Sequence, residues 1–252
     1  MAETDTALLR ARDVAQALSL LSRLPLPGMS HDRGARAAWA YPLAGMVIGG
    51  LAALAGVLAQ GLGLPLPLVA LVTLGVLVIC TGALHEDGLA DTADGLWGGW
   101  TRERRLEIMK DSHIGTYGVI ALVLSLGARW AALWLLFGDG PATAAAAIVA
   151  SAALSRGVMP CVMAVLPHAR ATGLSHSQGR PAPATAAVGI GIAFGLTLLL
   201  AGASGLWAAI WALIAAAAIS RIAQVRVGGQ TGDILGATQQ VVEIAVLFSI
   251  LP

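Results

Sequence analysis

Charged residues are scarce in this sequence. Asp, Glu, Lys and Arg make up 12% of its 252 residues, whereas hydrophobic residues make up 57%. A soluble domain has about 25% charged residues, so the shortage excludes an ordinary soluble fold. The 15 basic and 14 acidic residues nearly cancel, and the formal net charge is +1. This net charge says nothing useful about partners, and we expect no nucleic-acid partner.

Cysteine is also rare, and the histidines lack the spacing of metal ligands. The two cysteines, Cys80 and Cys161, lie inside apolar segments with no second cysteine or histidine nearby. This excludes a disulfide framework and a thiolate metal site, and we expect both side chains to serve packing. No histidine pair has the HxxxH or HExxH spacing of zinc ligands, so a zinc site is not expected.

Long apolar runs take the place of charge. Seven runs have about the 20 residues that a bilayer-spanning helix needs, at 39–60, 66–84, 117–137, 142–165, 184–202, 205–224 and 237–252. We therefore predict an all-α fold, a polytopic helical bundle with about seven transmembrane helices. The whole chain, residues 1–252, is expected to form one integral membrane domain in contact with the lipid bilayer.

The few charges between these runs indicate the topology. Basic residues occur in the N-terminal segment and in three connections, namely 85–116, 166–183 and the segment after 205–224. The other connections hold one charged residue, Asp139. Cytoplasmic loops carry an excess of Lys and Arg, so we expect the N-terminus and the three charged connections in the cytoplasm. No signal peptide is expected, because the first apolar run is too long for one.

Two N-terminal features concern membrane attachment and packing. Residues 7–24 alternate leucines with polar side chains, which predicts an amphipathic helix lying in the membrane interface as a simple anchor. In the first apolar run, Gly45 and Gly49 have GxxxG spacing, which favours close helix packing. That packing could be within the bundle or between subunits, so a homo-oligomer stays open.

The densest charge cluster follows the second apolar run directly. It extends from His85 to Gly95 and contains four acids, Glu86, Asp87, Asp91 and Asp94. We expect 85–116 to be a cytoplasmic acidic loop, in which glycines at 82, 88 and 95 allow the span to break and a new helix to begin near Asp87. On a helix the three aspartates would share one face. Carboxylate oxygens suit Mg²⁺, which shares its coordination shell with phosphates.

Two further polar runs lie on the same side. Lys110 can hold a phosphate as a point charge, and Ser112, Thr116 and glycine N–H groups can complete a cradle. An ordinary polar loop explains that run equally well. In the run from Gly228 to Gly236, glycine would permit backbone approach to a ligand, and Asp233 would be a further ligand for a metal or hydroxyl. The alternative there is a flexible connector.

Four charged residues fall inside the predicted spans. A charge in a span is costly and normally faces the bundle interior or a water-filled cavity. Arg156 and Arg221 lie toward the cytoplasmic ends, where they would be well placed to bind phosphates. Arg129 and Glu243 are candidates for pairing with each other.

Together, the three polar runs resemble the cobalamin synthase family, the adenosylcobinamide-GDP ribazoletransferases. The family pattern H-x-D-G-L-A-D-T-A-D-G is matched from His85 to Gly95, K-D-S-x-G-T-Y-G from Lys110 to Gly118, and G-G-x-T-G-D-x-L-G-A from Gly228 to Ala237. Smaller matches are the segments starting at Arg23 and Tyr41, and the pair Ser155-Arg156. Glu86 departs from the pattern, since a neutral residue is expected there.

The resemblance implies a membrane-bound bacterial enzyme of the last steps of vitamin B12 biosynthesis. A hydroxyl of α-ribazole, or of its 5′-phosphate, would attack adenosylcobinamide-GDP, forming adenosylcobalamin or its phosphate and releasing GMP. Mg²⁺ would be the cofactor, and the site would face the cytoplasm at the inner membrane. The implied metal ligands are Asp87, Asp91, Asp94 and Asp233. The implied catalytic residues are Asp87, Asp91, Asp94 and Asp111, and one of the first three would be the base. The implied substrate and phosphate ligands are His85, Lys110, Ser112, Thr116, Arg156, Arg221, Gly229, Thr231 and Gly232.

Two alternatives stay open. A CDP-alcohol phosphotransferase also holds a metal with aspartates at helical spacing, but its pattern expects arginine after the position of Ala90, where this chain has Asp91. A membrane transporter would use intramembrane charges as pathway residues, yet here the polar runs gather on one side rather than at the midplane.

Overall fold

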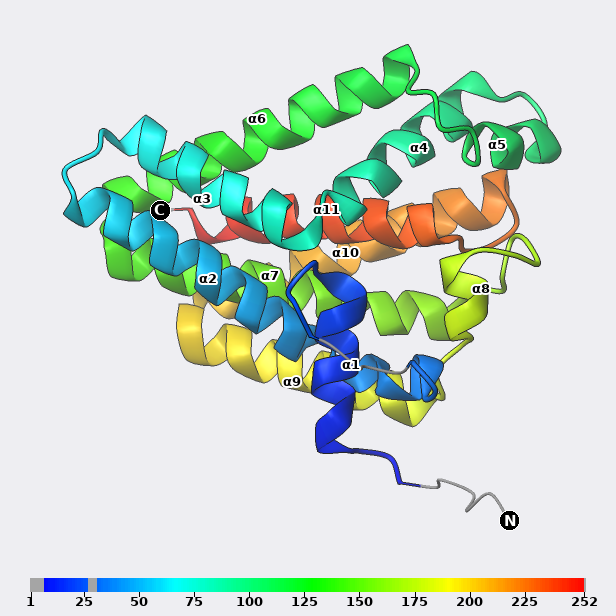
Figure 1. The fold of residues 1–252 in the computed structure, drawn as a ribbon, viewed down its shortest axis with the longest axis horizontal. Coiled ribbons are helices and arrows are strands. Elements are labelled where there is room, and N and C mark those ends of the chain that lie inside the picture. Colours follow the sequence, from blue (N-terminus) through cyan, green and yellow to red (C-terminus); the bar gives the residue numbers. More distant parts are fainter. Residues whose placement is uncertain (1–6, 27–30, 252) are drawn as a thin grey trace.

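Helices form wherever the sequence has a long apolar run (Figure 1). The computed structural model describes residues 7–26 and 31–251. Six helices are long and apolar enough to cross a membrane, and a bent pair raises the number to seven, as predicted. The six are α2 (Tyr41–Gly61) with the preceding 3-10 helix η1 (Gly34–Ala40), α6 (Thr116–Gly138), α7 (Pro141–Val165), α9 (Pro183–Ala201), α10 (Ser204–Arg226) and α11 (Gly232–Ile250). The bent pair is α3 (Leu66–Thr81) and α4 (Leu84–Gly98).

The all-α prediction is confirmed. The other helices of the described chain are short: α1 (Ala11–Leu21), α5 (Arg102–Ile108) and α8 (Leu174–Gln178). In the described residues, β pairing is limited to one isolated bridge between His168 and Gln230. The last helix begins five residues before the predicted run, because the Thr231 hydroxyl caps it by accepting from the backbone N–H of Ile234 at 3.2 Å. Pro252, the last residue of that predicted span, lies outside the described residues.

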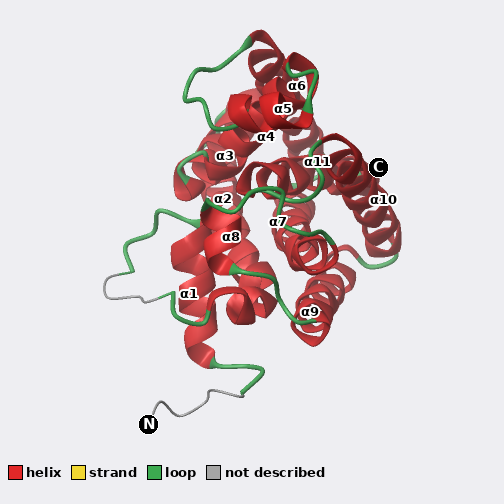
Figure 2. Cartoon of the chain, turned by 90° about the vertical axis from the view of Figure 1, so that its right-hand side faces the viewer, coloured by secondary structure: helices red, strands yellow, loops and turns green. Residues whose placement is uncertain are grey.

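The charged connections lie at one end of the bundle, and the connections with little or no charge lie at the other. The uncharged turns α2–α3 and α9–α10 lie at one end together with α6–α7, whose one charge is Asp139 (Figure 1). The opposite end holds α5, α8 and the α10–α11 connection, and Figure 2 looks onto it. The grouping expected from the sequence is therefore present in three dimensions.

Helix α1 is more than a membrane anchor. It crosses the direction of the long helices (Figure 1), which fits an interfacial position, but two of its polar side chains, Asp13 and Gln16, are buried in protein. Asp13 has no exposed surface. Its carboxylate accepts a hydrogen bond from Trp39 Nε1 at 2.7 Å and pairs with Arg33 Nε at 2.7 Å. The amphipathic helix expected from the sequence is present, and its role as a membrane anchor stays a prediction. Sequence periodicity could not show that Asp13 is covered by protein.

The GxxxG pair packs inside the bundle. A Cβ on Gly45 would strike the backbone of Ala152 and Ala153 in α7, and one on Gly49 would lie 2.8 Å from the Ala152 Cβ. Helices α2 and α7 therefore approach closely along this stripe. The structure assigns these glycines to internal packing and gives no support to their use between subunits.

The second span breaks between α3 and α4, and the two helices are bent by 86°. Gly82 ends α3 in the left-handed conformation with φ +62°, and Ala83 follows at φ +57°. The Arg23 side chain packs directly over Gly82. The break predicted from the glycines is present, and the new helix expected near Asp87 is α4, which begins at Leu84. The predicted loop 85–116 also contains the short helix α5.

Candidate active site

A cavity lies where the beginnings of α4 and α11 meet the end of α7. It encloses about 730 Å³ of empty space, part of it open to solvent. Its polar side includes His85, Asp87, Arg170 and Asp233. We call it the central cavity. It joins the first and third polar runs of the sequence, which are more than a hundred residues apart.

Two glycines let these runs meet. A Cβ on Gly88 would lie 3.0 Å from the backbone oxygen of Asp233 and 3.2 Å from the Cα of Gly236. A Cβ on Gly236 would lie 3.2 Å from the Gly88 Cα. Helices α4 and α11 therefore cross backbone to backbone, which only residues without side chains permit. The glycines of the two motifs serve this helix contact, and it brings the aspartates of both to one place.

Three carboxylates gather at this crossing. Asp87 is exposed on α4, and Asp91 is half-buried one turn further along. Asp87 and Asp233 are both close enough to Asp91 to act on it electrostatically. Arg170 donates to Asp233 Oδ2 at 2.8 Å, but no ion pair to Asp87 or Asp91 forms in the described part of the chain. Among the described residues, the three carboxylates therefore share a single paired guanidinium, that of Arg170.

Asp94 has a different position from the other two motif aspartates. It is buried, and its two carboxylate oxygens accept backbone hydrogen bonds from Gly115 at 2.7 Å and Gly118 at 2.9 Å. These amides begin α6, so Asp94 caps that helix and neutralises its positive end. A Cβ on either glycine would collide with the carboxylate. The predicted use of Asp94 as a metal ligand is therefore corrected to an anchor between α4 and α6.

The second polar run lies outside the central cavity. Lys110, Asp111, Ser112 and Thr116 are exposed and none of them lines that cavity. The second run meets the first run at Asp94 and not at the central cavity, because its glycine N–H groups bind the Asp94 carboxylate.

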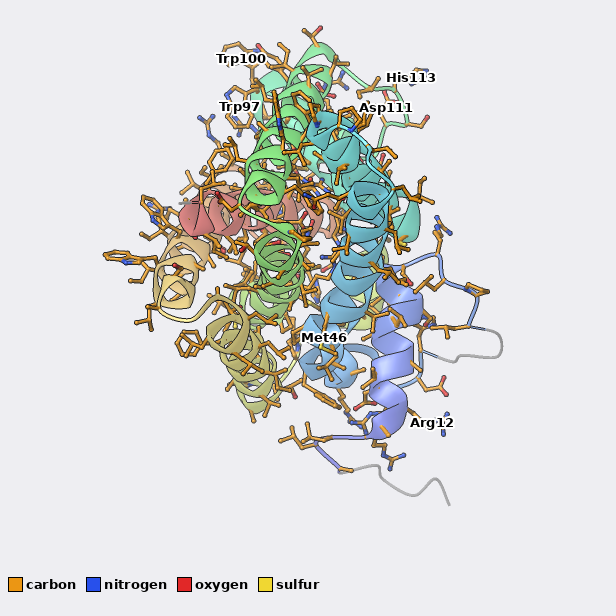
Figure 3. The ribbon with its side chains drawn as sticks, turned by 90° about the vertical axis from the view of Figure 1, so that its left-hand side faces the viewer. Arg12, Met46, Trp97, Trp100, Asp111 and His113 are labelled. Carbon is orange, nitrogen blue, oxygen red and sulfur yellow. The ribbon has the colours of Figure 1, made fainter. Side chains whose placement is uncertain are left out.

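Asp111 pairs with His113 rather than with the other acids. Asp111 Oδ1 lies 2.6 Å from His113 Nδ1, and both side chains point away from the helices (Figure 3). This hydrogen bond raises the pKa of His113 and lowers the pKa of Asp111. The predicted catalytic role of Asp111 finds no support in this position.

The third run is fixed to the end of α7. A Cβ on Gly229 would collide with the backbone oxygen of Pro167, so this glycine approaches protein rather than a ligand. The buried side chain of Gln230 donates to the backbone oxygens of Met163 at 2.9 Å and Leu166 at 3.1 Å. Thr231 donates to Asp233 Oδ2 at 3.1 Å, and Gly232 lines the cavity. This segment is a rigid support for Asp233, not a flexible connector.

Charges predicted inside the spans form a buried cluster. Arg129 Nη1 lies 2.7 Å from Glu86 Oε1, and Arg129 Nε lies 3.2 Å from Glu243 Oε1. The predicted pairing of Arg129 with Glu243 is confirmed. Arg156 Nη1 lies 3.5 Å from Glu243 Oε2. Each of these side chains is at most 7% exposed, so the cluster is a closed set of two cations and two anions.

The two arginines predicted to bind phosphates, Arg156 and Arg221, both lie outside the central cavity. Arg156 is enclosed in the buried cluster and does not line the central cavity, so its proposed phosphate contact is corrected to a structural ion pair. Arg221 is exposed on α10 in a second cavity beside Trp97 and Arg226. In the described chain, Arg170 is the one cation paired with an acid of the cavity. The sequence did not indicate this role, because Arg170 is an isolated arginine in a polar connection.

The donor set of the central cavity fits a hard divalent cation bound partly through substrate. Within residues 7–26 and 31–251, no three Asp, Glu, His or Cys side chains are arranged to enclose an ion unaided. Mg²⁺ usually takes one or two carboxylates and completes its shell with waters and phosphates. The carboxylates at the crossing of α4 and α11 can supply that number: Asp87 and Asp233 line the cavity, and Asp91 lies one turn after Asp87 on α4.

Comparison with known proteins identifies the family. The family model described as cobalamin-5-phosphate synthase matches residues 13–251. A protein of Azorhizobium caulinodans named adenosylcobinamide-GDP ribazoletransferase is 45% identical over 252 residues, covering 95% of each chain. Proteins of the same name from Rhizobium etli and Bradyrhizobium diazoefficiens are 46% and 45% identical, covering 94% and 93% of this chain and 95% and 91% of their own.

No solved structure matches the chain. The family match favours neither the CDP-alcohol phosphotransferase nor the transporter alternative. A match over residues 13–251, with relatives about 45% identical across nearly their full length, shows that the chain belongs to the cobalamin-5-phosphate synthase family.

Proposed function

We propose that this protein is an adenosylcobinamide-GDP ribazoletransferase whose reaction takes place at the central cavity. The hydroxyl of α-ribazole, or of its 5′-phosphate, attacks the cobinamide-side phosphorus of adenosylcobinamide-GDP. A new P–O bond forms, the bridging P–O bond of the pyrophosphate breaks, and GMP leaves. The observation that carries this proposal is the crossing at Gly88 and Gly236, which brings Asp87, Asp91 and Asp233 together without full charge compensation.

The carboxylates have divided tasks. Two of them, Asp91 and Asp233, would hold Mg²⁺ together with water and substrate phosphates, and the ion would neutralise pyrophosphate charge when bound. A carboxylate within hydrogen-bond reach takes the proton of the attacking hydroxyl, and Asp87, exposed at the cavity, is suitably placed. Arg170 orients Asp233 through their 2.8 Å hydrogen bond and offers a cation to a phosphate oxygen.

The orientation in the membrane follows from the charges. The charged connections, α5 and α8 lie at one end of the bundle (Figure 2), and basic loops remain in the cytoplasm. We therefore place this end, with the opening of the central cavity and the N-terminus, on the cytoplasmic face of a bacterial inner membrane. Adenosylcobinamide-GDP and α-ribazole would reach the site from the cytoplasm.

Product analysis tests the proposal. Purified protein is mixed with adenosylcobinamide-GDP, α-ribazole and Mg²⁺, and GMP and the corrinoid product are quantified by chromatography. We expect equal amounts of both, with neither formed when α-ribazole or Mg²⁺ is omitted. The Asp87→Asn variant should lose turnover, while the matched Asp139→Asn variant, exposed in the α6–α7 connection, should retain it. Corrinoid product formed equally well without divalent cation would contradict the metal assignment.

A further inference from the structure

The central cavity has an apolar wall that phosphate chemistry does not require. Besides its acids, the cavity is lined by Leu21 of α1, Met159 and Met163 of α7, and Leu235 of α11. These side chains are between 1% and 5% exposed. A pyrophosphate site needs cations and N–H donors, whereas an apolar wall beside a few polar groups is typical of a site for an uncharged organic ring.

His85 lies in the same cavity with its hydrogen-bonding capacity unused. The side chain is 1% exposed, and neither ring nitrogen has a hydrogen-bond partner among the described residues. Gln178, which also lines the cavity, has a buried Oε1 without a partner in that part of the chain. Leaving such groups unpaired is costly, so a bound molecule that pairs with them gains affinity and orientation.

We propose that this apolar part of the cavity binds the heteroaromatic base of the nucleoside substrate, and that His85 hydrogen-bonds its free ring nitrogen. The inference rests on the proposed function, and it assigns one substrate to one subsite. Neither ring nitrogen of His85 is engaged by any described residue, so its N–H group can donate to an acceptor in the cavity. The 5,6-dimethylbenzimidazole of α-ribazole has one ring nitrogen free to accept, and the rest of its edge is apolar.

Other parts of the substrates fit this subsite less well. A guanine base has several donors and acceptors along its edge, and burying them against leucine and methionine would leave them unpaired. The corrin ring carries amide side chains that raise the same difficulty. With the benzimidazole at His85, its ribose extends toward the cavity acids, and Gln178 Oε1 can accept from a ribose hydroxyl. The attacking hydroxyl is thereby directed toward Asp87, two residues from His85 on α4.

Paired nucleosides test the assignment. Full-length protein in lipid nanodiscs is titrated calorimetrically with α-ribazole and with its indole analogue, in which a C–H group replaces the free ring nitrogen. We expect the wild type to bind the indole analogue about tenfold more weakly. The His85→Phe variant should bind both equally, at the weaker affinity. The control His113→Phe changes a side chain that is 89% exposed and lies outside the cavity, and it should discriminate as the wild type does.

Kinetics separate this inference from the proposed function. In His85→Phe the KM for α-ribazole should rise about tenfold while the KM for adenosylcobinamide-GDP stays within twofold. A KM rise confined to adenosylcobinamide-GDP would overturn the inference. Equal binding of both nucleosides by the wild type would also overturn it, and this test holds even if the variant fails to fold. Absence of GMP release by the wild type would instead refute the proposed function, because the nucleoside titration does not depend on turnover.

Discussion

The buried ion cluster predicts a large loss of stability when one charge is removed. Glu243 is 1% exposed and faces both Arg129, at 3.2 Å, and Arg156, at 3.5 Å. Glu243→Gln keeps the size of the side chain but leaves two arginines against Glu86 alone. Removing one partner of a buried ion pair costs about 3–5 kcal/mol, so we expect the free energy of unfolding to fall by about that amount.

Equilibrium unfolding in mixed detergent micelles measures the change. The matched control is Glu103→Gln, an acid on α5 whose side chain is 79% exposed, for which the change should be within about 0.5 kcal/mol. A double-mutant cycle adds Arg156→Met, which removes a cation and the imbalance with it. The double variant should be more stable than the sum of single effects predicts, by about 0.5–3 kcal/mol. Additive losses, or a Glu243→Gln variant as stable as the wild type, would refute the account of the cluster.

Three further predictions concern local geometry. Ala83 has φ +57°, a conformation that costs about 1–2 kcal/mol for a residue with a Cβ. Ala83→Gly should therefore raise the free energy of unfolding by up to about 1 kcal/mol, since the greater entropy of glycine in the unfolded chain offsets part of the gain. A loss of stability would contradict this. Gly88→Ala adds a Cβ 3.0 Å from the Asp233 backbone and should reduce GMP release more than about tenfold. The control Gly50→Ala, with open space at the Cβ position, should not reduce it. Equal activities of the two variants would exclude a role for the α4–α11 crossing. Asp111→Asn should lower the pKa of His113 toward its ordinary value. At a pH near that value, His113 should be less protonated in the variant than in the wild type. An unchanged NMR titration of His113 would show that the hydrogen bond between the two side chains does not form.

The sequence predicted the helices well because span length and apolarity are local properties. The runs at 142–165 and 184–202 match α7 and α9 to within one residue at each end. The break at Gly82 was also predictable, since glycine tolerates the left-handed conformation that ends α3. The charged connections came together at one end of the bundle, as topology rules require (Figure 1).

The roles of single acids could not be predicted, because they depend on which helix end lies opposite. Asp94 shares a helical face with Asp87 and Asp91, and nothing in that spacing shows that the first amides of α6 would bind its carboxylate. One signal was present: the glycines at 115 and 118 leave room for a group at the start of a helix. We interpreted that group as a phosphate, and it is a side chain of the same chain.

Ion pairs between distant side chains could not be predicted from the sequence either. Glu86 departs from the family pattern, and its Oε1 lies 2.7 Å from Arg129 Nη1. Its partner is more than forty residues away on α6. Arg170 likewise has no sequence relation to Asp233, and the two meet only because Gln230 and Gly229 hold the start of α11 against the end of α7.

The central claim is that the motif aspartates divide between reaction and fold. The direct test compares GMP release and melting temperature in purified Asp91→Asn and Asp94→Asn variants. We predict that Asp91→Asn melts within a few degrees of the wild type but releases no GMP. Asp94→Asn should lose about 2 kcal/mol of stability with the α6 cap, and GMP release should persist while it remains folded. An inactive Asp94→Asn variant of unchanged melting temperature, or an Asp91→Asn variant with wild-type turnover, would contradict the account.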